Sequence, residues 1–162
     1  MTTFIYQVQD DTIDASVSEQ PDDLSRVTIA IDVHNPQSKR VACKEIRFEI
    51  AVPAQAENYL WPFLPTNPAA ITAVAVDTDH WEFSRSDYTF TAIPIARQGF
   101  AGLRAGESAT FLLQNVEVVP ATGPTPIKIT ETLADGSETK TEIILHKQSP
   151  DLRIDRFDAR KR

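Results

Sequence analysis

Residues 26–52, RVTIAIDVHNPQSKRVACKEIRFEIAV, decide the fold class of this chain. Apolar and polar residues alternate through Arg26–His34 and again through Glu45–Val52. A period of two places the apolar side chains on one face of a strand, and the polar residues between them mean that the other face meets water. Asn35 and Pro36 end the first strand in a polar turn, because proline has no amide hydrogen to donate. The segment predicts two strands of an antiparallel structure.

Similar patterns recur along the rest of the chain. Tyr88–Ile95 shifts phase at Ile93-Pro94-Ile95, which predicts a bulge or a sheet edge. An Asp135-Gly136 pair predicts a tight hairpin, and the only helical signal is a turn or two at Asn67–Ala70. We therefore expect an all-β, antiparallel β-sandwich, immunoglobulin-like or jelly-roll-like, with about eight strands and little or no helix. The other predicted strands are Phe4–Val8, Ile13–Val17, Ile71–Val76, His80–Ser84, Ser108–Val119, Ile127–Leu133 and Glu138–His146.

Length and charge narrow the classes of protein further. The 162 residues suit one domain, which we place at 1–148, with 149–162 as a tail or the start of a linker or next module. The net charge of −7 disfavours nucleic acid and anionic membranes as partners. No apolar stretch approaches the roughly 18 residues of a membrane span, and the first residues lack a signal-peptide pattern. A cytoplasmic location is favoured, or an extracellular one if the chain is a fragment of a longer protein.

Three short segments resemble the immunoglobulin-like and fibronectin-like β-sandwich modules of multidomain bacterial proteins. One is the strand followed by Asn35-Pro36 and a second strand, and another is the Ala-Gly-Glu turn within Leu103–Ser108 before an apolar strand. The third, Ile154–Ala159, is similar to the Ile-x-x-Phe-x-Ala run that opens the next module in such proteins. Together they cover about a third of the chain. The resemblance implies a non-catalytic binding or spacer role.

Aromatic residues between prolines mark the first candidate binding site. Tyr59, Trp61 and Phe63 lie in a segment of irregular backbone, where they form either a platform for a partner or a plug over one end of the sandwich. Phe100 lies in the glycine-containing loop Arg97–Gly102, and we expect it to be exposed as a lip of the same binding end.

Acidic residues mark a second candidate site. Asp77 and Asp79 share a face if their segment is extended, and Asp87 follows in the next turn. Converging carboxylates are the ligands that calcium prefers, although acids in turns between strands explain the cluster equally well. No cofactor other than this calcium ion is suggested.

No catalytic signature accompanies these sites. Cys43 has no second cysteine to pair with, and we expect it to be a structural thiol. The spacing of His34, His80 and His146 does not indicate a base for Cys43 or a set of metal ligands. We expect a non-catalytic binding or assembly module that contacts another protein, or a second copy of itself, through loops or an edge strand. The alternative is a carbohydrate-binding module, with calcium assisting. An enzyme stays open only because sandwich folds can assemble sites from scattered residues.

Overall fold

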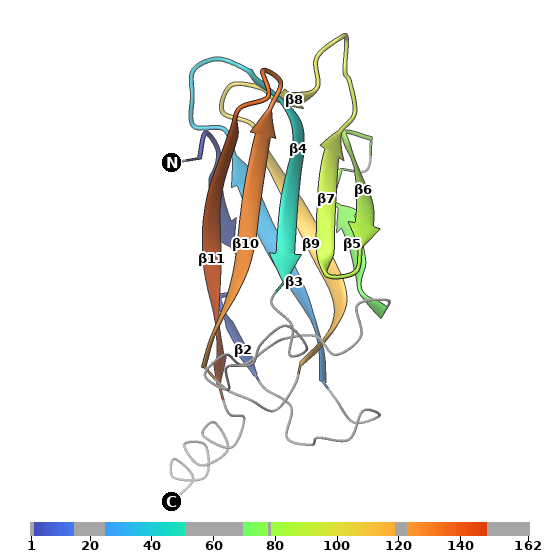
Figure 1. The fold of residues 1–162 in the computed structure, drawn as a ribbon, viewed down its shortest axis with the longest axis vertical. Helices are drawn as coiled ribbons and strands as arrows, with labels where there is room; N and C mark the ends of the chain where they lie inside the picture. The colour runs from blue at the N-terminus through green and yellow to red at the C-terminus, as the bar shows by residue number, and fades with distance from the viewer. Residues whose placement is uncertain (1, 15–24, 51–69, 78, 119–122, 149–162) are drawn as a thin grey trace, which may run out of the picture.

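The computed structural model describes residues 2–14, 25–50, 70–77, 79–118 and 123–148, which form two β-sheets packed face to face (Figure 1). The strand order of the first sheet is β1 (Ile5–Val8), β3 (Ser25–His34), β9 (Ser108–Val118) and β5 (Thr72–Ala75). The order of the second sheet is β2 (Thr12–Asp14), β11 (Glu138–Gln148), β10 (Gly123–Leu133), β4 (Val41–Ile50), β7 (Thr89–Pro94) and β6 (Trp81–Ser86), with β8 (Gly102–Leu103) also paired to β4.

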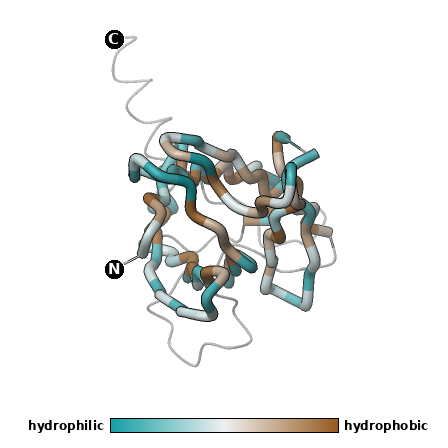
Figure 2. The backbone as a smooth tube through the Cα atoms, turned by 90° about the horizontal axis from the view of Figure 1, so that it is seen from above, coloured by the Kyte–Doolittle hydropathy of each residue, from teal (hydrophilic) through white to brown (hydrophobic). Residues whose placement is uncertain are grey.

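The predicted β-sandwich is confirmed, and the described residues contain no α-helix. No described helix is therefore of a length and hydropathy that would cross a bilayer. Figure 2 looks along the strands and shows hydrophobic and hydrophilic residues interleaved along the tube, as a period of two requires. The strands pair antiparallel except β2, which runs parallel to β11. The Asn67-Pro68-Ala69 part of the expected helical turn, and Ala15–Val17 of the expected second strand, lie outside the described residues.

The two strands of the opening segment are confirmed, but they are not neighbours. β3 pairs with β1 and β9 in the first sheet, whereas β4 pairs with β10 and β7 in the second. The connection 35–40 therefore crosses from one sheet to the other. Alternation alone reports which side chains face a core, and it does not distinguish two strands of one sheet from two strands that face each other across that core.

The expected phase shift in Tyr88–Ile95 is wrong. In β7 the side chains of Phe90, Ala92 and Pro94 are all buried, so the period of two continues to the end of the strand. Pro94 is tolerated because it is the last residue of β7.

The shift occurs instead in β9. Val27 of β3 faces Val116, but Ile29 faces Leu113, so one extra residue is inserted in β9 and Asn115 adopts a positive φ of 60°. Both Leu113 and Val116 are buried as a result. This bulge explains why Ser108–Val119 carries apolar residues at both odd and even positions.

Phe111 joins the two sheets at the centre of the core. Its ring, from β9, meets Phe48 of β4 edge-on at a centroid distance of 5.8 Å, and meets Trp81 and Phe83 of β6 at 5.0 and 5.4 Å. Edge-to-face pairs at these distances add to the stabilisation from burial. The prediction that Trp81 and Phe83 lie on one side of their strand is confirmed.

A buried carboxylate anchors the N-terminal strand. Glu131, on β10, has no exposed surface, and its two oxygens accept hydrogen bonds from the amides of Thr3 and Phe4 at 2.8 and 2.9 Å. The Tyr6 hydroxyl donates to it at 2.9 Å, and Thr139 Oγ1 at 3.1 Å. Burial and then the charge of Glu131 raise the pKa of Tyr6 above its usual range, so the phenol remains a donor. These bonds tie β1 of one sheet to β10 of the other.

Replacing Phe48 by Ala is expected to lower the free energy of unfolding by about 3–5 kcal/mol, because the side chain is fully buried and its loss leaves a cavity beside Phe111. Urea denaturation followed by circular dichroism measures the change. The control is Ile5→Ala, since Ile5 is 53% exposed and should cost less than about 1 kcal/mol. A loss under about 1 kcal/mol for Phe48→Ala would contradict the packing described here.

Candidate functional site

Two connections meet at one end of the sandwich, at the top of Figure 1, and residues 35–40 and 95–107 are called the loop end here. They are held together because β8, within the second connection, pairs with the start of β4 through Val41–Leu103 and Ala42–Gly102. Gly102 has a φ of +151°, and a Cβ atom there would collide with the carbonyl oxygen of Val41. Only glycine permits this approach of the two backbones.

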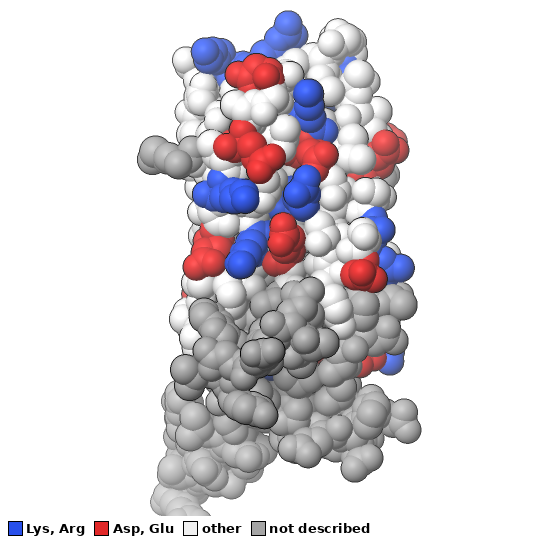
Figure 3. Space-filling view, viewed as in Figure 1, with Lys and Arg blue, Asp and Glu red and all other residues white. Residues whose placement is uncertain are grey.

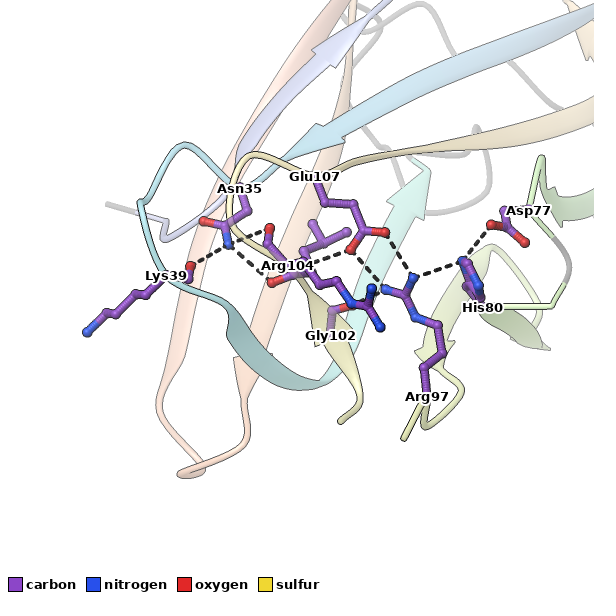
Figure 4. A network of polar contacts seen from close by, with 9 residues as sticks. Asn35, Lys39, Asp77, His80, Arg97, Gly102, Arg104 and Glu107 are labelled. Atoms are coloured by element: carbon purple, nitrogen blue, oxygen red, sulfur yellow. Dashed lines mark hydrogen bonds and ion pairs between the residues drawn. The ribbon is translucent and has the colours of Figure 1, made fainter. Parts of the chain in front are cut away.

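Asn35 fixes both connections from within. Its side chain is completely buried, and Nδ2 donates to the carbonyl oxygens of Lys39, Leu103 and Arg104 at 3.0 to 3.1 Å (Figure 4). Its Oδ1 accepts from the amide of Gln37 at 3.0 Å. One amide group therefore contacts four backbone groups of the two connections, and the Arg104 carbonyl also accepts from the amide of Glu107 at 3.0 Å.

The contacts of Asn35 are one brace of the loop end, and the ion pair of Arg97 and Glu107 is the second. Nη2 and Nη1 of Arg97 donate to the two oxygens of Glu107 at 2.8 and 3.0 Å, which is a two-pronged ion pair. Arg97 Nη2 also donates to the Gly102 carbonyl at 3.3 Å, and the Arg104 amide donates to Glu107 Oε1 at 2.8 Å. The side chains are 14% and 25% exposed, so water screens this pair only in part.

The surroundings of this pair stabilise its charged form. Burial opposes ionisation of Glu107, but hydrogen bonds from Arg97 and from the Arg104 amide outweigh it and hold the pKa of the Glu107 carboxyl below its ordinary 4.5. The hydrogen bond to Glu107 raises the pKa of Arg97 in turn. Both groups are charged at neutral pH.

His80 and Asp77 extend the polar contacts toward β6. His80 Nδ1 lies 2.5 Å from Asp77 Oδ2 and 3.2 Å from Arg97 Nη1 (Figure 4). The shorter contact requires a hydrogen on Nδ1 that is donated to Asp77, since a carboxylate can only accept. The series Asp77, His80, Arg97 and Glu107 therefore crosses the loop end with an acid at each side and two bases between them.

A hollow of about 370 Å³ opens beside these braces. Among its lining residues are four cations and no carboxylate. The guanidinium of Arg40 lies over the Phe100 ring, 4.9 Å from its centroid, which is a cation–π contact. The lining residues are Ser38, Lys39, Arg40, Arg97, Gln98, Phe100, Arg104 and Ala105.

A second hollow, of about 560 Å³, lies on the outer face of β4, β10 and β11. It is lined by two lysines and two glutamates, so its charges balance: Glu49, Lys128, Ile129, Thr130, Lys140, Thr141 and Glu142. Figure 3 shows the same mixture of blue and red over these three strands, and blue side chains at the loop end. A surface with both signs interspersed is typical of a solvated sheet face.

The expected exposure of Phe100 is wrong. It is only 7% exposed, because its ring is covered by Arg40 and the Arg97–Phe100 backbone bridge folds the loop back on itself. Tyr59, Trp61 and Phe63 lie outside the described residues, and their role as platform or plug stays a prediction. The chain enters their segment from the Ile50 end of β4, whereas Phe100 lies near the Val41 end.

The three acids of the predicted calcium site are not brought together. Asp77 and Asp79 precede β6 and Asp87 follows it, so a six-residue strand, about 20 Å long, separates them. Within the described residues no group of three or more His, Cys, Asp or Glu side chains could hold a metal ion. Asp77 accepts instead from the Asp79 amide at 3.2 Å and pairs with His80, as acids in turns do.

The thiol and the remaining histidines lie apart. Cys43 is buried, and burial followed by the charge of Glu131 raises the pKa of its thiol to about 12. His34 Nδ1 lies 2.7 Å from Ser108 Oγ at the surface, and the side chain of His146 is exposed on β11. Cys43 is therefore an inert structural residue at neutral pH.

Sequence reasoning missed the braces. Asn35 and Arg97 stood out only as members of a turn and a loop, and Glu107 only as part of an Ala-Gly-Glu turn. Their one sequence signal is that each lies among turn residues next to a strand, and nothing in their spacing shows that they meet.

No protein-family model matches the sequence, and no curated protein is similar to it in sequence. The fold is similar to a chain of the type I cohesin–dockerin complex Coh-OlpA–Doc918 from Clostridium thermocellum, with a TM-score of 0.52, 10% identity, and coverage of 91% of this chain and 100% of that one. It is also similar to BcpA, the major pilin subunit of Bacillus cereus, with a TM-score of 0.51, 8% identity, and coverage of 90% of this chain and 40% of that one. At such identities the similarity shows the β-sandwich fold alone.

Replacing Arg97 by Met is expected to lower the free energy of unfolding by about 1–3 kcal/mol, because Glu107 then stays partly buried without its cation. Arg47→Met is the matched control, since the Arg47–Glu45 pair is more exposed and should contribute less than about 1 kcal/mol. Urea denaturation measures both variants, and an equal loss in the two would show that the loop-end pair is an ordinary surface contact.

The Glu107 pair also predicts a pH dependence. The folded pKa of Glu107 lies below its ordinary 4.5, so its contribution to stability is present above pH 4.5 and disappears as the pH falls through the folded value. The difference in unfolding free energy between wild type and Glu107→Gln should therefore be largest near neutral pH and shrink in acid. A difference that stays constant across this range contradicts the assignment.

Proposed function

We propose that this chain is a non-catalytic binding module that contacts another protein through the loop end. The observation that carries the proposal is the double brace of Asn35 and the Arg97–Glu107 pair, which fixes two irregular connections on a rigid sandwich. Loops held in this way lose little conformational entropy when a partner binds, which is how a preorganised site gains affinity.

The exposed side chains of the loop end are suited to contact. Lys39, Arg40 and Arg104 are exposed, while the groups that hold them in place lie beneath them. Binding residues that stand on loops fixed by a rigid scaffold are the common arrangement in β-sandwich recognition domains.

One open edge, strand β6, is less suited to contact a partner. β6 ends one side of the second sheet, and its exposed residues Glu82, Ser84, Arg85 and Ser86 are charged or polar. Charged side chains on a short edge strand oppose pairing with a further strand. This favours the loop end over β6 as the contact surface.

The carbohydrate alternative has less support among the described residues. Asp77 is committed to His80, and Arg40 covers the ring of Phe100, so neither offers a free calcium ligand or an open stacking face. Sugar recognition would then depend on Tyr59, Trp61 and Phe63, which lie outside the described residues.

A photo-crosslinking amino acid at Gln98 tests the proposal, because Gln98 is exposed and lines the hollow of the loop end. In lysate of the source cells, the variant that carries the photo-crosslinking amino acid at position 98 is expected to give a discrete cross-linked band. Mass spectrometry then identifies the partner in this band. The control carries the same amino acid at Glu142, which is exposed on the outer face of β11.

The same bands from both positions, or a band from Glu142 alone, would overturn the loop end as the contact surface. A Gln98 band that disappears in the Arg97→Met background, with the fold intact, would tie the contact to the brace.

A further inference from the structure

Three cations of the loop end have no acidic counterpart among the residues that the structure describes. Among the described residues no carboxylate forms an ion pair with Lys39, Arg40 or Arg104. Glu107 is the acid nearest in the chain to Arg104, but both of its oxygens are engaged by Arg97. The charge of Glu107 is therefore already matched, and the three remaining cations face the hollow as an uncompensated positive group in a chain whose net charge is −7.

The contact between Arg40 and Phe100 orients one of these cations. The ring of Phe100 meets the guanidinium at 4.9 Å from its centroid. A guanidinium that stacks through its flat face keeps its N–H groups available at its edge, and this fork matches the two oxygens of a carboxylate. The arginine is thus held by an uncharged residue and its hydrogen-bonding capacity is left free.

We propose that the hollow of the loop end is a receptor for an acidic segment of the protein partner, with Lys39, Arg40 and Arg104 pairing with Asp or Glu side chains. The assignment rests on the proposed function and adds the chemistry of the partner to it. A hollow of about 370 Å³ accommodates one or two carboxylate side chains rather than a folded domain, so the recognised element is a short peptide segment.

The charge distribution favours a peptide over a long polyanion. Asp77 and Asp79 lie at the same end of the sandwich, and Asp77 pairs with His80, whose Nδ1 lies 3.2 Å from Nη1 of Arg97. A nucleic acid or sulfated polysaccharide that extended beyond the hollow would meet these acids and the negative charge of the whole chain. A short segment engages the three cations without reaching them.

Fluorescence anisotropy with the full chain tests the proposal. The probes are a labelled hexapeptide of alternating Asp and Glu and its Asn and Gln counterpart. The acidic hexapeptide is expected to bind, and its affinity should fall as salt is raised, because exposed charge pairs are screened. The Asn and Gln peptide should not bind.

Two double variants of equal net charge locate the site. Lys39→Glu with Arg104→Glu should weaken binding of the acidic hexapeptide on the order of 10- to 100-fold, since two attractive contacts become repulsive. Lys128→Glu with Lys140→Glu, at the second hollow, changes the total charge by the same amount and should leave the affinity within about twofold. Both variants keep Arg40 over Phe100, and circular dichroism checks their fold.

The opposite results overturn the proposal. An equal loss in both double variants would show attraction to overall charge rather than to the loop end, and binding of the Asn and Gln peptide would show that charge is not what is recognised. An oligonucleotide of equal charge is also measured. If it binds more tightly than the peptide, and its binding is lost when Lys39 and Arg104 are replaced, the site is a receptor for a polyanion and not for a peptide.

The two proposals can fail separately. If the cross-link at Gln98 forms but the acidic peptide does not bind, the loop end remains a protein-contact surface and the proposal that the partner segment is acidic is wrong. If the acidic peptide binds but no cross-link forms, the hollow remains a receptor for acidic segments and the proposed protein contact is wrong for the cells tested.

Discussion

The side-chain amide of Asn35 is the constraint on which the rest of this molecule depends. The chain must cross from one sheet to the other directly after β3, and the crossing leaves backbone carbonyls inside the end of the sandwich. A single buried amide satisfies them on both connections. An apolar residue of similar size would remove these hydrogen bonds, and each buried carbonyl left without another partner costs about 1–3 kcal/mol.

The alternation of side chains made the strands and the sandwich predictable, because burial on one face of a strand needs only a local period of two. Assignment of strands to sheets was not predictable, since β3 and β4 show the same pattern whether they pair or face each other. The bulge at Asn115 was missed for a related reason. Its effect is a change of register against β3, and register is a property of two strands.

The candidate site was less predictable than the fold. Aromatic and acidic clusters were selected because they are contiguous in the sequence, whereas the groups that meet in space come from separate connections: Asn35, Arg97 and Glu107. Asp77 illustrates the difference, because its counterpart is a histidine three residues away and not the aspartates that suggested calcium. Phe100 likewise contacts Arg40 rather than solvent. Convergence of this kind depends on the topology, which local spacing does not encode.

The buried carboxylate of Glu131 has a consequence for the order in which the fold can be completed. The amides of Thr3 and Phe4 leave the ribosome long before Glu131 does, so β1 can begin to pair with β3 but cannot reach its anchor until β10 has been synthesised. Without the amides of Thr3 and Phe4, burial of this carboxylate would be unfavourable. The hydrogen bonds between the start of the chain and β10 therefore form only after the late part of the chain has been synthesised.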